Sequence, residues 1–202
     1  MSYLPLEERH AEISVLHSRF LVFVCPLKNV DDFAKRYAQI HRDFPGADHY
    51  PYAYKVGIAE KASDDGEPSG AAGRPFLGLI QKKDFDQVAL IAVRYFGGSK
   101  LGLPRLTRTF LMTAVQAVEG LRIGQEEIGH QVKLSLTYHD YENLQKRAER
   151  MGLTLSETSF SSNVDLLVSG DATIFTSLSA LGIPKEAITD LGPITTIKEI
   201  KL

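Results

Sequence analysis

The sequence predicts an α+β protein of two domains, residues 1–126 and 127–202. The length of 202 residues suits one large domain or two small ones, at roughly 100–200 residues per domain. Segments with the alternation of strands are mixed with segments that have the apolar stripe of helices. Glycines flank an acidic pair at Gly124–Gly129, a composition typical of a linker.

In the first domain, a few residues mark where the helices begin and end. Pro45 and Gly46 end the first helix, and Pro75 and Pro104 suit the first turn of two later ones. The expected elements are strands at Ile13–Leu16 and Arg19–Cys25, a helix from Asp31 or Asp32 to Phe44, a strand at Tyr52–Ala59, a loop at Glu60–Gly73, a helix from Pro75 to Lys83, a buried strand at Val88–Tyr95 and a helix from Pro104 to Gly120.

The second domain has a cleaner pattern. Its expected elements are a strand at Gln131–Tyr138, a helix from Asp140 to Met151, strands at Leu153–Phe160 and Val164–Ser169, a helix from Asp171 to Leu181 and a strand at Thr195–Ile200. The order strand, helix, strand, strand, helix, strand is that of a small ferredoxin-like βαββαβ domain.

Composition excludes several classes of protein. The net charge of −2 argues against a globally basic nucleic-acid-binding protein. Cys25 is the only cysteine, so neither an intramolecular disulfide nor a multi-cysteine metal site is possible. The apolar runs are shorter than the ~20 residues that span a bilayer, and the start lacks a signal-peptide pattern, which predicts a cytoplasmic protein without a membrane partner.

The most unusual stretch lies between Asp86 and Glu119, which contains basic residues and no acidic one. Here a strand leads through a glycine-rich loop into a helix, so backbone N–H groups and the positive helix end point toward one place. The predicted anion- or nucleic-acid-binding residues are Arg94, Gly97, Gly98, Lys100, Arg105 and Arg108. The alternative is a tight turn followed by a solvated basic face.

A second candidate is the acidic loop that contains Asp64, Asp65 and Glu67. Its composition favours a mobile loop, with a recognition role or none. The alternative is that the three carboxylates hold a cation such as Mg²⁺. The six histidines have no metal-ligand spacing, and the sequence predicts no resident metal or cofactor.

Several motifs together resemble the IMPACT/YigZ family over residues 13–120. They are Ser18–Phe20, Ser63–Pro68, Ala72–Pro75, Val93–Gly98 and Lys100–Gly102. The resemblance implies a first domain similar to the second domain of a small-subunit ribosomal protein, and a second domain similar to one of elongation factor G. Eukaryotic members are translation regulators, and nucleic-acid or ribosome binding is suggested for bacterial ones. This sequence has Leu103-Pro104-Arg105 where the family usually has Thr-Gly-Gly.

The hypothesis that follows is a non-catalytic binding protein, associated with RNA or the ribosome and with a role in translation regulation. One alternative is a Mg²⁺-dependent enzyme acting on a phosphorylated small molecule. Another is a protein–protein regulator that uses the acidic loop to dock a protein partner. Arg94 is open to a different interpretation, in which it pairs with Asp64, Asp65 or Glu67 and is structural.

Overall fold

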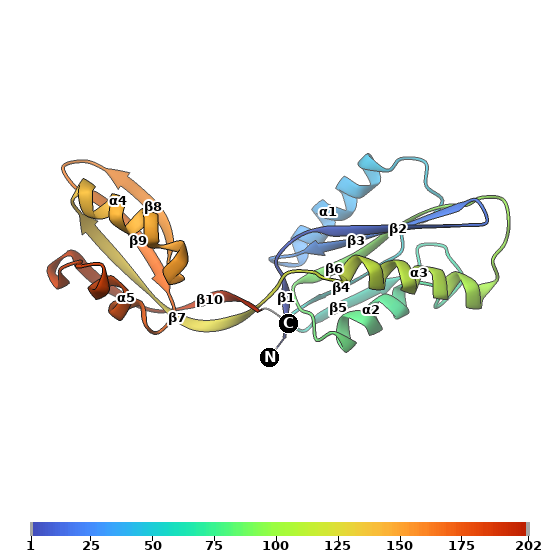
Figure 1. The fold of residues 1–202 in the computed structure, drawn as a ribbon. Helices are drawn as coiled ribbons and strands as arrows, with labels where there is room; N and C mark the ends of the chain where they lie inside the picture. Colours follow the sequence, from blue (N-terminus) through green and yellow to red (C-terminus); the bar gives the residue numbers. More distant parts are fainter. Residues whose placement is uncertain (1, 201–202) are drawn as a thin grey trace. The chain divides into compact units, whose positions relative to one another are not determined.

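The computed structural model describes residues 2–200, which form two compact units (Figure 1). One unit contains residues 2–125 together with Glu199 and Ile200. The other contains residues 126–198. Each unit has a sheet, its own helices and its own hydrophobic core.

The first unit is built on a five-stranded antiparallel sheet in the order β2-β3-β6-β4-β5. The strands are β2 (Arg9–Val15), β3 (Ser18–Pro26), β4 (Tyr52–Val56), β5 (Ala59–Ser63) and β6 (Val88–Tyr95). Helix α1 (Val30–Asp43) covers one face, and α2 (Gly73–Lys82) and α3 (Leu103–Val118) cover the other (Figure 1). Since β6 is central and covered on both faces, it is apolar at nearly every position.

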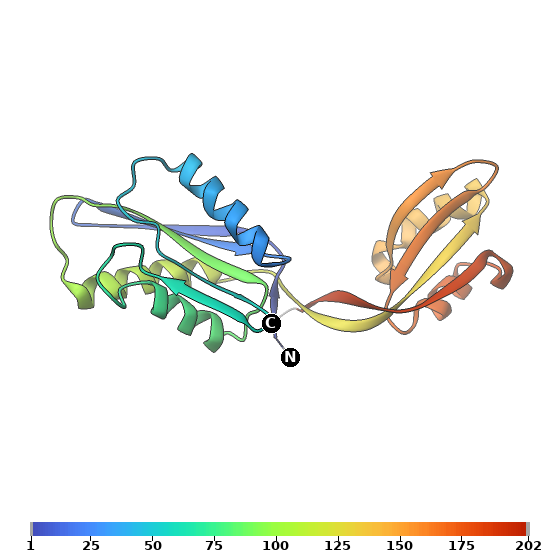
Figure 2. The same cartoon turned by 180° about the vertical axis from the view of Figure 1, so that it is seen from behind.

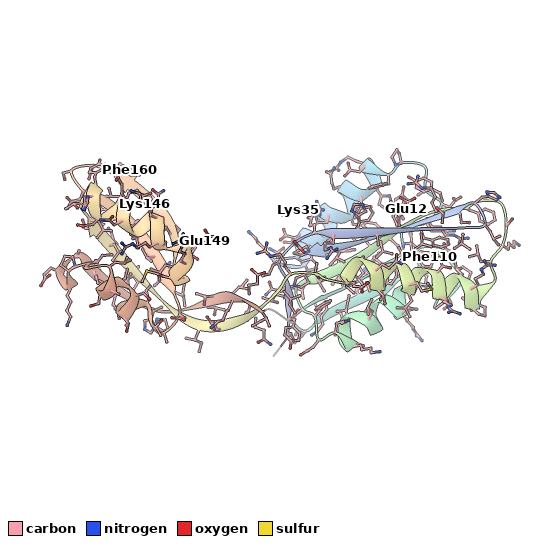
Figure 3. The ribbon with its side chains drawn as sticks, viewed as in Figure 1. Glu12, Lys35, Phe110, Lys146, Glu149 and Phe160 are labelled. Atoms are coloured by element: carbon pink, nitrogen blue, oxygen red, sulfur yellow. The ribbon has the colours of Figure 1, made fainter. Side chains whose placement is uncertain are left out.

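Two hydrophobic cores hold this sheet. Phe110 of α3 (labelled in Figure 3) packs edge-on against Phe20 of β3 and Phe76 of α2, with ring centroids 5.0 and 6.0 Å apart. The core under α1 is largely aromatic, with Phe33 and Tyr37 of the helix against the strand residue Tyr52. A short strand β1 (Leu4–Pro5) pairs with the beginning of β7 in the same unit.

The second unit contains β7 (Ile123–Leu136), α4 (Tyr138–Arg147), β8 (Thr154–Phe160), β9 (Val164–Gly170), α5 (Ile174–Ala180) and β10 (Ile188–Ile200). Its strands lie in the order β10-β7-β9-β8, and Figure 2 shows the sheet from its open side. Leu144 of α4 and Leu178 of α5 pack in one core with Val132 and Leu166 of the strands, so both helices lie on the same face. Two 3₁₀ turns, Glu149–Met151 and Lys185–Ala187, complete the unit.

The predicted helices and strands occur in the predicted order, but β1 and β5 were not predicted and several boundaries were wrong. The expected strand Tyr52–Ala59 is a hairpin, since Gly57 adopts φ 58° and the chain turns back as β5 within the expected loop. The expected linker Gly124–Gly129 is part of β7, because these residues belong to a continuous strand that pairs with β1 and β10. Helix α4 begins after Thr137, whose hydroxyl accepts the N–H of Asp140 at 3.2 Å.

The mixed α/β architecture is established, whereas the ferredoxin-like and ribosomal-protein-like assignments stay predictions. None of the helices within residues 2–200 has the length and apolar character that crossing a bilayer requires.

Candidate anion-binding cleft

The two loops singled out in the sequence meet at one end of the first unit. There the loop after β6, the acidic loop after β5 and the segment before β4 surround a cleft of about 400 Å³. Its lining is Asp48, His49, Glu67, Pro68, Arg94, Phe96, Lys100, Leu101, Gly102, Leu103 and Leu106. A larger cavity of about 920 Å³ lies around the C-terminal end of α3 and contains none of the predicted site residues.

Asp64 folds the acidic loop back onto itself. Its carboxylate accepts the backbone N–H groups of Gly70 at 2.7 Å and of Ala72 and Gly73 at 2.8 Å. Burial alone would raise the pKa of Asp64, but these three hydrogen bonds and the charge of Arg74 outweigh it, and the pKa is lowered. These hydrogen bonds count against the expected mobility of the loop, because its carboxylates anchor it.

Asp65 ties the acidic loop to the segment before β4. Its carboxylate accepts the N–H of Tyr50 at 2.7 Å, and its carbonyl oxygen lies 2.8 Å from Nδ1 of His49. Asp65 has a φ of 45°, a conformation that aspartate tolerates better than most residues. The loop and the segment thus form one wall of the cleft.

Glu67 forms a buried ion pair with Arg94 of β6. Nη1 of Arg94 donates to Oε1 and Oε2 of Glu67 at 2.7 and 2.6 Å, and the two side chains are 7% and 1% exposed. The guanidinium carbon also lies over the rings of Phe20 and Phe96, 5.2 and 5.4 Å from their centroids. Arg94 was predicted to bind an anion, and the structure shows the alternative interpretation of its charge, which Glu67 compensates.

The same contacts argue against the alternative in which the three carboxylates of the acidic loop hold Mg²⁺. Asp64 and Asp65 point at backbone N–H groups and Glu67 at Arg94, so the three carboxylates do not converge. In the part of the chain that the structure describes, no group of three His, Cys, Asp or Glu side chains could hold a metal ion.

The glycine-rich loop has a structural role at its first glycine. The N–H of Gly97 donates to the buried Ser18 hydroxyl at 3.0 Å. A Cβ at this position would lie 2.2 Å from the carbonyl carbon of His17, so only glycine fits. Gly98 has φ 84° and open space around it. Gly97 was predicted to be part of the anion site, but its N–H already donates to the hydroxyl of Ser18.

Lys100 and the N-terminus of α3 bring positive charge to the cleft. The helix follows Gly102, which has no side chain to cap it, and the first turn holds no acidic residue. Its first N–H groups lack intrahelical partners, which gives this end a partial positive charge. Arg105 and Arg108 are exposed on α3, next to the cleft but outside its lining.

Sequence reasoning missed the segment Asp48–Pro51. It runs alongside the end of β6, with a bridge between His49 and Arg94. The carboxylate of Asp48 accepts the N–H of Phe96 at 2.7 Å. The only local sign in the sequence is that His49-Tyr50-Pro51 has no regular helix or strand pattern. The residues that this segment contacts, around Arg94, are about 45 positions further along the chain.

Comparison with known proteins identifies the family of this chain. Residues 16–118 match the family model of the Impact N-terminal domain, and the chain belongs to the IMPACT family. An IMPACT family member of Thermus thermophilus is 40% identical over 104 residues, which are 52% of this chain and 56% of that protein. The chain therefore matches little more than half the length of that relative.

Two further similarities extend over more of the chain. An IMPACT family member of Haemophilus influenzae is 28% identical over 165 residues, 78% of this chain and 79% of that one. A solved crystal structure of a hypothetical protein has a TM-score of 0.61 at 22% identity and covers 95% of this chain and 97% of its own. The latter similarity concerns the fold alone.

Proposed function

We propose that this chain is a non-catalytic binding protein that contacts RNA, free or within the ribosome, and takes part in translation regulation. The phosphate-binding surface in this proposal consists of Lys100, Arg105 and Arg108. The translational role is the one that membership of the IMPACT family implies, and the RNA contact is argued from the surface itself.

The observation that carries the proposal is that the three cations of this surface make no ion pair. Within residues 2–200, Lys100, Arg105 and Arg108 have no ion-pair partner. Four other arginines of the same unit, Arg19, Arg36, Arg94 and Arg122, each pair with a glutamate, whereas Arg9, Arg42 and Arg74 make no ion pair in the described chain. Unpaired cations beside a helix N-terminus attract phosphate groups.

The contacts of the acidic loop favour binding over metal-assisted catalysis. Asp64, Asp65 and Glu67 already hold the loop in place, and no nucleophile with an adjacent base is evident in the sequence. The cleft walls are therefore fixed by the protein's own contacts, as suits a preformed recognition site.

The experiment is a titration of the full chain against a fluorescent single-stranded RNA at several salt concentrations. Three phosphate contacts predict a slope of about −2 in a plot of log K against log salt, at roughly −0.7 per contact on single strands. Absence of binding at low salt, or binding that does not change with salt, would refute the proposal.

A further inference from the structure

We propose that the cleft between the acidic loop and the start of α3 holds the terminal phosphate of an RNA strand, with the terminal base against Phe96. This inference rests on the proposed function and names the chemical group that its site selects. The ligand is a phosphate monoester, distinct from the internal phosphodiesters that Arg105 and Arg108 contact, and Lys100 is shared by the two sites.

The first observation is the unused hydrogen-bonding capacity of Arg94. Both hydrogen bonds to Glu67 come from Nη1. Within residues 2–200, Nε has no partner and is closed off from solvent, and Nη2 makes no hydrogen bond. Arg94 is only 6% exposed and lines the cleft. An anion in the cleft provides an acceptor for Nη2, whereas Nε, which is closed off from solvent, is out of its reach.

The second observation is the balance of charge in the cleft. Glu67 is neutralised by its ion pair with Arg94, whereas Asp48 accepts the N–H of Phe96 through one oxygen and keeps its negative charge. Lys100 has no ion-pair partner in the described chain, and the uncapped start of α3 adds the N–H groups of Leu103 and Arg105, since Pro104 between them has none. The donors and the positive charge of Lys100 and the start of α3 therefore lie beside one carboxylate, that of Asp48, which has no ion-pair partner within residues 2–200.

The third observation concerns size and shape. A cleft of about 400 Å³ is in the range of sites for small ligands, roughly 300–1,000 Å³. It suits one nucleotide at the end of a strand better than a continuous chain. Phe96 is 43% exposed and offers a ring on which a base can stack. Leu101, Leu103 and Leu106 form an apolar wall beside it.

Charge separates a terminal from an internal phosphate. A phosphate monoester carries about −1.5 to −2 at neutral pH and has three acceptor oxygens, whereas an internal phosphodiester carries one negative charge. A site with several converging donors therefore prefers the monoester.

The test compares three single-stranded RNA decamers of one sequence, with a 5′-phosphate, a 3′-phosphate or neither, each labelled at an internal position. We expect the full chain to bind one phosphorylated decamer at least tenfold more tightly than the unphosphorylated one. Lys100→Ala and Phe96→Ala should each reduce this ratio below threefold. Lys83→Ala, which removes an exposed lysine outside the cleft, should leave the ratio unchanged.

The possible failures are distinguishable. Equal binding of all three decamers would overturn the terminal-phosphate site and leave the proposed RNA binding intact. Absence of binding to any decamer would overturn both. Uridine 5′-monophosphate alone is a further probe, and an affinity equal to that of the phosphorylated decamer would assign the cleft to free nucleotides and overturn the RNA-end assignment. If Phe96→Ala lowers the melting temperature, the test of the terminal-phosphate site rests on Lys100→Ala alone. Lys100 is exposed, so its replacement should not disturb the fold.

Discussion

Arg94 of the central strand and Glu67 of the acidic loop form a forked, buried ion pair, with Nη1 2.7 and 2.6 Å from the two carboxylate oxygens. This pair links the loop to the sheet and positions one side of the cleft. Because the guanidinium carbon also lies over the rings of Phe20 and Phe96, the position of Phe96 depends on the same contact.

Glu67→Gln should destabilise the first unit by about 3 kcal/mol, because it leaves Arg94 buried without a compensating charge. Chemical denaturation measures this change. The matched control is Glu12→Gln (Glu12 is labelled in Figure 3), which breaks the exposed pair with Arg19 and should cost only about 0.5 kcal/mol. Similar costs for the two variants would show that the buried pair does not hold the loop.

Asp64→Asn should also destabilise the chain, by about 2 kcal/mol at neutral pH, because backbone N–H groups lose a charged acceptor. The pKa of Asp64 is lowered in the folded chain. Its stabilisation is therefore fully present above the unfolded value of about 3.9 and is lost as pH falls through the folded value.

The difference between wild type and Asp64→Asn should accordingly shrink as pH falls from about 5 toward 2. Unfolding midpoints measured over this range test the sign. A difference that grows with acidity would contradict the assigned role of the carboxylate.

Gly97→Ala should severely destabilise the protein, because the new Cβ would meet the backbone of His17 at 2.2 Å. Gly78→Ala is the matched control, since Gly78 lies in α2 with open space around it. That change should stabilise the helix by up to about 1 kcal/mol. Thermal unfolding of both variants decides, and a Gly97→Ala protein that melts like wild type would refute the close approach.

The second unit should fold alone. Residues 126–198 contain a complete core, with Leu134 and Leu166 packed against helices of the same unit. A fragment of residues 126–202 is expected to melt cooperatively, as followed by circular dichroism. A fragment without a cooperative transition would show that the unit needs the rest of the chain.

The sequence was sufficient for elements with strong local periodicity. The buried strand Val88–Tyr95 and the three helices of the first unit were predicted because their apolar spacing is local. Strand β5 was missed because Ala59–Ser63 lacks β-branched and aromatic residues and forms only by pairing with β4. The extension of β7 through Gly124 was also missed because it depends on pairing, since its partner β1 is more than 100 residues away in the sequence.

For the candidate site, too, the local features could be predicted from the sequence and the long-range contacts could not. The basic loop and the acidic loop were each recognised from composition, and the pairing of Arg94 with one of three carboxylates was among the alternatives. Only the fold determines that Glu67 is the partner, because Asp64 and Asp65 are turned toward backbone N–H groups. His49 and Asp48 could not be found locally, since they reach the cleft through a bridge to β6.

The double variant Lys100→Ala plus Arg105→Ala tests the central claim most directly. Its salt dependence of binding to single-stranded RNA should be measured beside that of Lys82→Ala plus Lys83→Ala, two exposed lysines at the end of α2. Loss of two phosphate contacts should weaken binding and flatten the log–log slope by about 1.4, at roughly 0.7 per contact, while the control keeps the wild-type slope. An unchanged slope in the Lys100/Arg105 variant, or an equal change in both variants, would contradict RNA binding by this surface.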